Sequence, residues 1–399
     1  MPISAHTERA HALLSASSAS RWIACPPSAR LQESVPDTTS EYAEEGTLAH
    51  EFAEVTLRRR LTRCNAKERK EIEEREARIR AHALFAPEMD NAVREYCAIV
   101  EERFFAAKAR SEDAVVLLEQ RLDYSEWVPE GYGTGDVVLI ADGVLEVIDL
   151  KFGKGVPVSA VGNPQIRLYG LGAWSAWSYL YDVREVHLTI VQPRLDSVST
   201  DVLPIGELLE WAQTAVKPAA ALADAGEGEF KPGDHCRFCK VKATCRARAD
   251  ENLAAVAYEF REPALMSDEE IGSLLFVAER LSTWAEDVQK YAFEQAKSGH
   301  KIPFWKLVEG RSNRAIVDKP KAIEALKAAG LAEDKYLKPK ELYGIGDLEK
   351  HVGKKELVTL LGDLIQKPPG KPVLVAETDK RPELNSLDQD FAGETFEAQ

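Results

Sequence analysis

The sequence predicts an α/β protein with a core of strands around one helix, a helical N-terminal region and a mainly helical C-terminal region. Three features of the sequence support this prediction. Residues 41–110 are charged and rich in alanine, with Gly46 and Pro87 as the only helix-breaking residues. Short segments rich in β-branched residues begin at Ala114. After Arg248 the pattern changes again, and Glu269–Lys297 has the periodicity of a long amphipathic helix.

The core is predicted from four short strands and two helices. One helix, Pro164–Tyr181, begins with a proline at the first helical position, where Asn163 can cap it. The other, Leu208–Ala223, leads into a cluster of cysteines. Strands on both sides of the first helix are typical of an α/β core. The predicted strands are Ala114–Arg121, Asp136–Ala141, Val144–Phe152 and Glu185–Gln192.

The chain is predicted to divide into four parts. Residues 1–110 form a helical segment, and residues 111–250 form the core with its cysteine cluster. Residues 251–370 form a mainly helical accessory domain, and residues 371–399 form an extended tail. Within the accessory domain, Phe304–Arg314 is predicted to be a strand.

The composition is that of a soluble globular protein, and we expect a cytoplasmic one. The chain has 399 residues, of which 45% are hydrophobic and 29% charged, with a formal net charge of −15. No apolar run approaches the roughly 18 residues of a membrane-spanning helix, and the first residues lack the pattern of a signal peptide. The acidic balance argues against non-specific coating of nucleic acid, but it does not exclude a local basic groove.

The most specific segment is a predicted β-hairpin. Asp142-Gly143 between two β-rich runs is the strongest short signal for a two-residue type I′ turn. Counted outward from this turn, Asp136 falls opposite Asp149, so both carboxylates share one face about 4.5–5.5 Å apart and can bind one divalent cation. Lys151, two residues beyond Asp149, points to the same face. An ordinary surface hairpin with an Asp–Lys ion pair is the alternative, which is disfavoured because charges within apolar strands are costly unless paired or metal-bound.

Asp136 followed by Asp149-Leu150-Lys151 resembles the core motif of the PD-(D/E)XK nucleases. Two further matches point to the RecB-like group of that superfamily. Gln165 and Tyr169 match its Q-x-x-x-Y motif, and Glu45–His50 (EGTLAH) is similar to the segment that supplies its metal-binding histidine. The resemblance implies a restriction-endonuclease-like core, a mixed sheet flanked by helices, with a helical N-terminal insertion.

Four of the six cysteines form a second candidate site. Cys236, Cys239 and Cys245 have the spacing C-x2-C-x5-C, and a cytosolic cysteine cluster first suggests a metal site. Together with Cys25 far upstream, this set resembles the iron–sulfur RecB-like nucleases, in which four cysteines bracket the core and bind a [4Fe–4S] cluster. Such a cluster would act as a structural clasp between distant segments. A four-thiolate Zn²⁺ site remains the alternative.

The resemblance implies metal-dependent hydrolysis of DNA phosphodiester bonds. His50, Asp136 and Asp149, with the backbone of Leu150, would hold Mg²⁺ or Mn²⁺. Lys151 would position or deprotonate water, or stabilise developing charge. Gln165 would orient Lys151 or the water, and Tyr169 would contact a base or a phosphate. We expect an exonuclease that acts on DNA ends or single strands, although the sequence leaves endonuclease action, polarity, strand preference and oligomeric state open.

The C-terminal region is similar to that of a phage and prophage family built on this nuclease core. Its members often end in a GKP…DKRP-like segment, which corresponds to Gly370–Pro372 and Asp379–Pro382. DNA recombination or replication is the implied context, with a helicase, a single-strand-binding protein or a recombination protein as a partner in trans. The chain contains no G-x-x-x-x-G-K-[ST] motif, so we expect no ATP binding through a P-loop.

Two other functional classes stay open on the sequence alone. One is a DNA-binding or recombination-mediating module whose nuclease site is silent, although the complete set of candidate site residues argues against it. The other is a zinc-stabilised protein-interaction scaffold. The colour of the pure protein distinguishes the latter, because an iron–sulfur protein is brown and a zinc protein is colourless.

Overall fold

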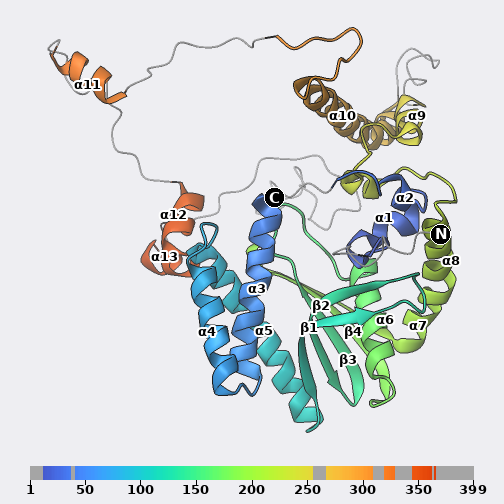
Figure 1. The fold of residues 1–399 in the computed structure, drawn as a ribbon, viewed down its shortest axis with the longest axis vertical. Helices are drawn as coiled ribbons and strands as arrows, with labels where there is room; N and C mark the ends of the chain where they lie inside the picture. The colour runs from blue at the N-terminus through green and yellow to red at the C-terminus, as the bar shows by residue number, and fades with distance from the viewer. Residues whose placement is uncertain are drawn as a thin grey trace, which may run out of the picture. The chain divides into compact units, whose positions relative to one another are not determined.

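The computed structural model describes residues 12–36, 41–254, 267–308, 319–328, 344–361 and 364. The chain divides into two compact units, Met1–Leu342 and Tyr343–Gln399. The first unit contains a five-stranded mixed sheet with the order β1-β2-β3-β4-β5 (Figure 1). The strands are β1 (Val115–Asp123), β2 (Tyr132–Ala141), β3 (Gly143–Leu150), β4 (Val183–Gln192) and β5 (Ser197–Pro204).

The sheet is mixed because one of its four strand pairs is parallel. β1, β2 and β3 pair antiparallel, β3 and β4 pair parallel, and β4 and β5 pair antiparallel. A parallel pair needs a crossover, which is supplied here by helix α6 (Pro164–Trp177). Asn163 caps this helix as predicted, since its side chain accepts a hydrogen bond from the Gln165 N–H, and Pro164 opens the first turn.

The predicted hairpin register is confirmed, but the predicted turn type is wrong. Ala141 pairs with Val144, and the ladder runs to the pair Val137 and Ile148. Of the two turn residues only Gly143 has a positive φ, +80°, whereas a type I′ turn requires a positive φ at both. The Gly143 N–H bonds the Asp182 carbonyl at 3.1 Å, so contacts outside the hairpin help to shape the turn.

The two faces of the sheet are covered by different helices, which produces two hydrophobic clusters (Figure 1). Val138, Ile140, Leu145 and Val147 face the cluster formed with α6 and the N-terminal segment. Alternating residues of the same strands, among them Val137 and Ile148, face the cluster formed with α3 and α5. This alternation is the expected period of two along a strand.

Residues 41–110 form three helices, as their composition predicted. They are α3 (Glu41–Leu61), α4 (Ala66–Arg80) and α5 (Pro87–Arg110). Asn65 and Glu68 form a complete capping box at the start of α4, and a proline opens α5. α3 and α5 bury an apolar stripe against the sheet, and α4 packs on α3.

The remaining elements of the first unit surround the cysteines or extend beyond them. α10 was predicted within one residue, and the predicted helix at 208–223 is a continuous helical run that includes a short π-helical segment, η3. The elements are η1 (Ala16–Ser18), α1 (Ala19–Ala24), α2 (Ser28–Leu31), η2 (Pro193–Leu195), α7 (Ile205–Trp211), η3 (Ala212–Val216), α8 (Lys217–Ala225), η4 (Asp234–Phe238), α9 (Arg246–Ala254), α10 (Asp268–Lys297) and α11 (Lys319–Ala328).

The second unit contains two short helices among its described residues, α12 (Ile345–Val352) and α13 (Lys354–Leu361). The predicted strand Phe304–Arg314 is not formed over its described part, residues 304–308, and the rest of it lies outside the described residues. The predicted tail and its GKP and DKRP segments also lie outside them. No helix in the described parts of the chain has the length and apolar character needed to cross a membrane.

Candidate metal centre

The end of the β2–β3 ladder creates the place where the predicted site residues meet. The regular pairs stop at Val137 and Ile148, one position before the two aspartates. There the backbone N–H of Leu150 donates a hydrogen bond of 2.7 Å to Oδ2 of Asp136. Asp136 is thereby fixed against the end of β3, although it is not paired with Asp149 in the ladder.

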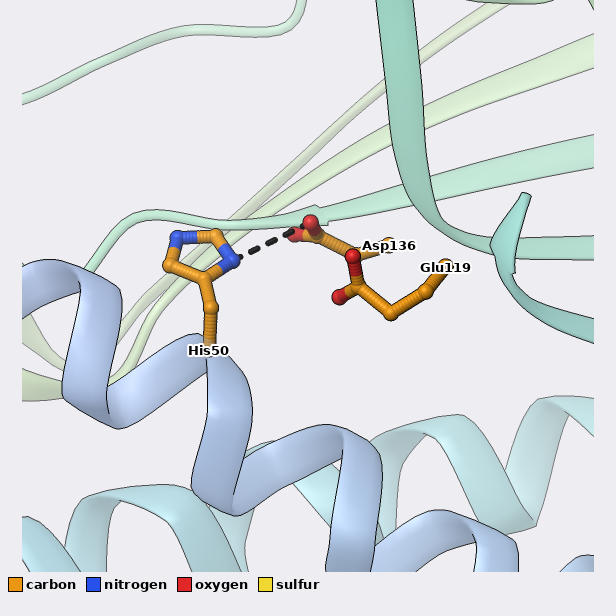
Figure 2. Close-up of side chains that lie close together, drawn as sticks. All are labelled: His50, Glu119 and Asp136. Atoms are coloured by element: carbon orange, nitrogen blue, oxygen red, sulfur yellow. Dashed lines mark hydrogen bonds and ion pairs between the residues drawn. The ribbon is translucent and has the colours of Figure 1, made fainter. Parts of the chain in front are cut away.

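His50 reaches this centre from helix α3. Its Nδ1 lies 3.0 Å from Oδ1 of Asp136 (Figure 2). Burial alone would lower the pKa of His50, but the charge of Asp136 and its hydrogen bond raise that pKa from 6.5 to about 9. The same partner and the Leu150 N–H hold the pKa of Asp136 below its usual value, despite the burial that acts in the opposite direction. The histidine and this aspartate therefore form an ion pair in the metal-free protein.

Glu119 is the third member of the group, and the sequence analysis missed it. Its carboxylate, with His50 and Asp136, supplies one donor atom each, and all three atoms lie within 4.8 Å of one another (Figure 2). Glu119 lies in β1 with φ +50°, in the left-handed region that costs a residue with a side chain about 1–3 kcal/mol. Burial and the charge of Asp136 raise its pKa to about 7. A glutamate within a short β-rich run carries no pattern that would single it out.

Lys151, Asp149 and Gln165 form the other side of the centre. Lys151 Nζ lies 2.9 Å from Oδ2 of Asp149 and donates a 3.1 Å hydrogen bond to Oε1 of Gln165. Gln165 Nε2 donates to the Tyr169 hydroxyl at 3.4 Å. The predicted Gln–Tyr face of α6 is therefore directed at Lys151. Burial raises the pKa of Tyr169 to about 12, so its hydroxyl stays protonated.

The donor set fits a divalent cation. Asp149 is 4% exposed, and its Oδ2 has no aligned hydrogen bond even though the Lys151 ammonium is close. Burial and the charge of Asp136 raise the pKa of Asp149 and outweigh the attraction of Lys151. Two buried carboxylates close enough for the charge of one to raise the pKa of the other are an environment that a hard cation with oxygen ligands would relieve. His50, Asp136, Glu119 and Asp149 are the side chains that could hold it.

The predicted cysteine set comes together at a separate place in the first unit. Cys25, Cys236, Cys239 and Cys245 all line one small cavity of about 20 Å³. All four are free thiols. Gln32 helps to connect the two chain segments, since its Oε1 accepts from the Lys240 N–H at 2.8 Å.

The cysteine cavity also fits a bound group. Ser28 is 3% exposed and lines the cavity, yet its hydroxyl has no hydrogen-bond partner. Within the described residues, no three of the cysteine sulfurs lie within 4.8 Å of one another. A tetrahedral zinc site with Zn–S bonds of about 2.3 Å would bring its sulfurs to about 3.8 Å. The metal-free spacing is thus wider than a single zinc ion requires.

Two comparisons with known proteins provide the wider context. The chain is similar to a solved structure entitled "Crystal structure of SSO0001", at 12% sequence identity, covering 57% of this chain and 96% of that one with a TM-score of 0.19. A family described as "Protein of unknown function (DUF2800)" matches residues 11–382. Because this match spans most of the sequence, the chain belongs to the DUF2800 family.

Proposed function

We propose that the protein is a divalent-metal-dependent deoxyribonuclease of the PD-(D/E)XK type, with a RecB-like core. The observation that carries this proposal is the convergence of His50, Asp136 and the Asp149–Lys151–Gln165 group at the end of the β2–β3 ladder. Carboxylates, a histidine and a buried lysine in one site are the groups that metal-assisted phosphoryl transfer needs.

In this proposal His50, Asp136 and Asp149, with the Leu150 carbonyl, hold Mg²⁺ or Mn²⁺. A bound cation supplies charge neutralisation at the phosphate and makes a water molecule more acidic. The protein's own groups provide the remaining functions. The charge of Asp149 raises the pKa of Lys151 against the effect of burial, so Lys151 stays cationic and can stabilise negative charge on the phosphate.

Gln165 and Tyr169 position the lysine rather than react. The Gln165 amide oxygen accepts from the Lys151 ammonium, and its nitrogen donates to the Tyr169 hydroxyl. This chain of contacts fixes the ammonium at the distance from Asp149 seen in the structure. Positioning of this kind lowers the activation barrier because the group needs no reorganisation during the reaction.

We further propose that the cysteine cavity binds a [4Fe–4S] cluster as a structural clasp. The wide spacing of the sulfurs favours a polynuclear cluster over a single Zn²⁺. The cluster would connect the N-terminal segment to residues 236–245. Anaerobically purified protein should be brown, with a broad absorption band in the visible range. If the protein is colourless and contains one equivalent of zinc, the cavity is a zinc site and the cluster proposal is wrong.

The test of the nuclease proposal is cleavage of end-labelled single- and double-stranded DNA with Mg²⁺, Mn²⁺ or EDTA. Wild type should cut only with a divalent cation, and Lys151→Ala and Asp149→Ala should not cut. Lys154→Ala removes a nearby lysine that is half exposed and pairs with Glu88, so it should keep the activity of wild type. A stable protein that binds DNA without cutting it would establish the binding-module alternative instead.

The substrate is proposed to be DNA ends or single strands, within cytoplasmic DNA replication or recombination of the phage type. A helicase, single-strand-binding or recombination protein would act in trans. Closed circular duplex tests this part, because an enzyme that needs an end leaves it intact. Equal rates on closed and linear duplex would contradict the exonuclease assignment without affecting the metal chemistry.

A further inference from the structure

A small pocket lies behind the candidate metal centre. It is small, with a volume of about 10 Å³, and is lined by His50, Glu119 and Asp136 together with Tyr96 and Leu150. Asp149 and Lys151 do not line it. The pocket therefore opens on the side of Asp136 that faces α3 and α5, away from the lysine and α6.

Tyr96 is the unexpected member of this lining. It lies in α5, is 1% exposed, and its hydroxyl has no hydrogen-bond partner. A buried hydroxyl without a partner costs about 1–3 kcal/mol, so tyrosine is a poor choice here if the pocket is only part of the core. Phenylalanine would fill the same space without this penalty. The hydroxyl therefore indicates an occupant of the pocket that accepts or donates a hydrogen bond.

Glu119 supports the same conclusion independently. β1 leaves regular backbone geometry at this residue, where φ is +50°, between the pairs Leu118–Val137 and Gln120–Gly135. The strained conformation directs a carboxylate toward Asp136, another carboxylate (Figure 2). Bringing two carboxyl groups together through a strained residue is unfavourable, and a cation bound by both of them would relieve this cost.

We infer that the centre holds a second, inner divalent cation in this pocket, bound by His50, Glu119 and Asp136, with the Tyr96 hydroxyl holding a water ligand of that cation. Asp136 is shared, since it borders both this pocket and the side occupied by Asp149 and Lys151. The inference rests on the proposed function and refines its ligand set by assigning His50 to the inner position. Asp136, Asp149 and the Leu150 carbonyl remain for the outer one.

The expected contribution of the inner cation follows from general chemistry. Paired cations about 4 Å apart, bridged by a carboxylate, can stabilise both the attacking and the leaving oxygen of a phosphodiester hydrolysis. The mixed nitrogen and oxygen donors of the inner site favour Mn²⁺ over Mg²⁺, because imidazole is a better ligand for the transition metal. Each cation should therefore be removable by changes that leave the other in place.

The experiment is a Mn²⁺ titration of the full-length protein, followed by electron paramagnetic resonance and calorimetry. Wild type should bind two equivalents. Glu119→Gln should bind one of them at least about 10-fold more weakly, and Tyr96→Phe should weaken the same equivalent by about 10-fold, which is the usual effect of removing an outer hydrogen bond. Asp149→Asn should weaken the other equivalent.

Two matched variants control for side effects. Glu126→Gln changes an exposed glutamate, and Tyr124→Phe removes a buried hydroxyl that already bonds the Tyr132 carbonyl at 2.8 Å. Both should bind two equivalents with the affinities of wild type. Thermal unfolding of each variant shows whether it is folded before its binding is compared.

The outcomes separate this inference from the proposed function. One equivalent in wild type, with an affinity unchanged in Glu119→Gln and Tyr96→Phe, overturns the inner site even if DNA is cut. Two equivalents that respond as expected in a protein that never cuts DNA support the inner site and overturn the nuclease proposal. A wild type that binds no Mn²⁺ overturns both.

Discussion

The candidate metal centre and the cysteine cavity are built in different ways. The metal centre is formed by regular elements, with donors on α3, β1, β2 and β3, and internal hydrogen bonds already hold Asp136 and Lys151 in place. The cysteine cavity is formed by short elements whose donors are about 210 residues apart in the chain. A preformed site can be changed with little effect on folding, whereas a site between distant, loosely connected segments depends on its bound group for stability.

Changing Asp136 should produce the largest effect, and that effect should fall on activity. In Asp136→Asn the side-chain oxygen can still accept from the Leu150 N–H, but the negative charge toward His50 and the cation is lost. We expect single-turnover DNA cleavage to fall by about 10³-fold, which corresponds to about 4 kcal/mol. Asp142→Asn, at the other end of the hairpin, should cut at the rate of wild type. A loss of less than about 10-fold in Asp136→Asn would contradict the assignment of this aspartate.

Changing a cysteine of the cavity should mainly affect stability. Cys239→Ser removes one proposed ligand, so we expect the free energy of unfolding to fall by about 3 kcal/mol, since binding of the group is coupled to folding. Thermal denaturation and the visible spectrum measure this change. Cys64→Ser lies outside the cavity and should stay within about 1 kcal/mol of wild type. Equal stability of the two variants would mean that the four cysteines hold no structural group.

Changing Arg194 should affect both stability and metal binding, because this side chain pairs with the helix that carries His50. Its side chain is 6% exposed and pairs with Glu45 of α3 at 3.0 Å and with Glu88 of α5 at 3.2 Å. Arg194→Met would leave two carboxylates without this partner, and we expect a loss of about 2 kcal/mol in unfolding free energy together with weaker Mn²⁺ binding. Arg184→Met, at an exposed pair with Asp182, should change stability by less than about 0.5 kcal/mol. If Arg194→Met has a lower free energy of unfolding but an unchanged Mn²⁺ affinity, Arg194 has only a structural role.

The last expected effect is a pH dependence of the metal-free protein. The pKa of His50 is raised from 6.5 to about 9 by Asp136, against the effect of burial. A pKa that is raised on folding stabilises the protein fully below the unfolded value, and this stabilisation is lost as the pH rises through the folded value. In EDTA, the melting temperature should therefore fall between pH 6.5 and about 9, and His50→Gln should reduce this slope. An identical slope in the variant would show that the ion pair does not contribute.

The strand core was predictable because its patterns are local. The two-residue turn at Asp142-Gly143, counted outward, predicted the register from Ala141–Val144 to Val137–Ile148, and Asn163-Pro164 marked the start of α6. β5 was not predicted, because Ser197–Pro204 has few buried residues and is recognisable mainly through its pairing with β4. The turn type was wrong because Asp142 does not adopt the positive φ that a type I′ turn requires at that position.

The sequence by itself determined which side chains can meet at the hairpin, since register and helical spacing follow from short-range geometry. It also identified the four cysteines that line one cavity. Only the tertiary structure decided that Glu119 and Tyr96 line the same pocket as His50 and Asp136. Glu119 reaches it through a single left-handed residue in β1, and Tyr96 reaches it because α5 packs against the sheet. Neither a local backbone distortion nor the packing of a helix on a distant strand leaves a periodic signal in the sequence, so these contacts become visible only when the chain is folded.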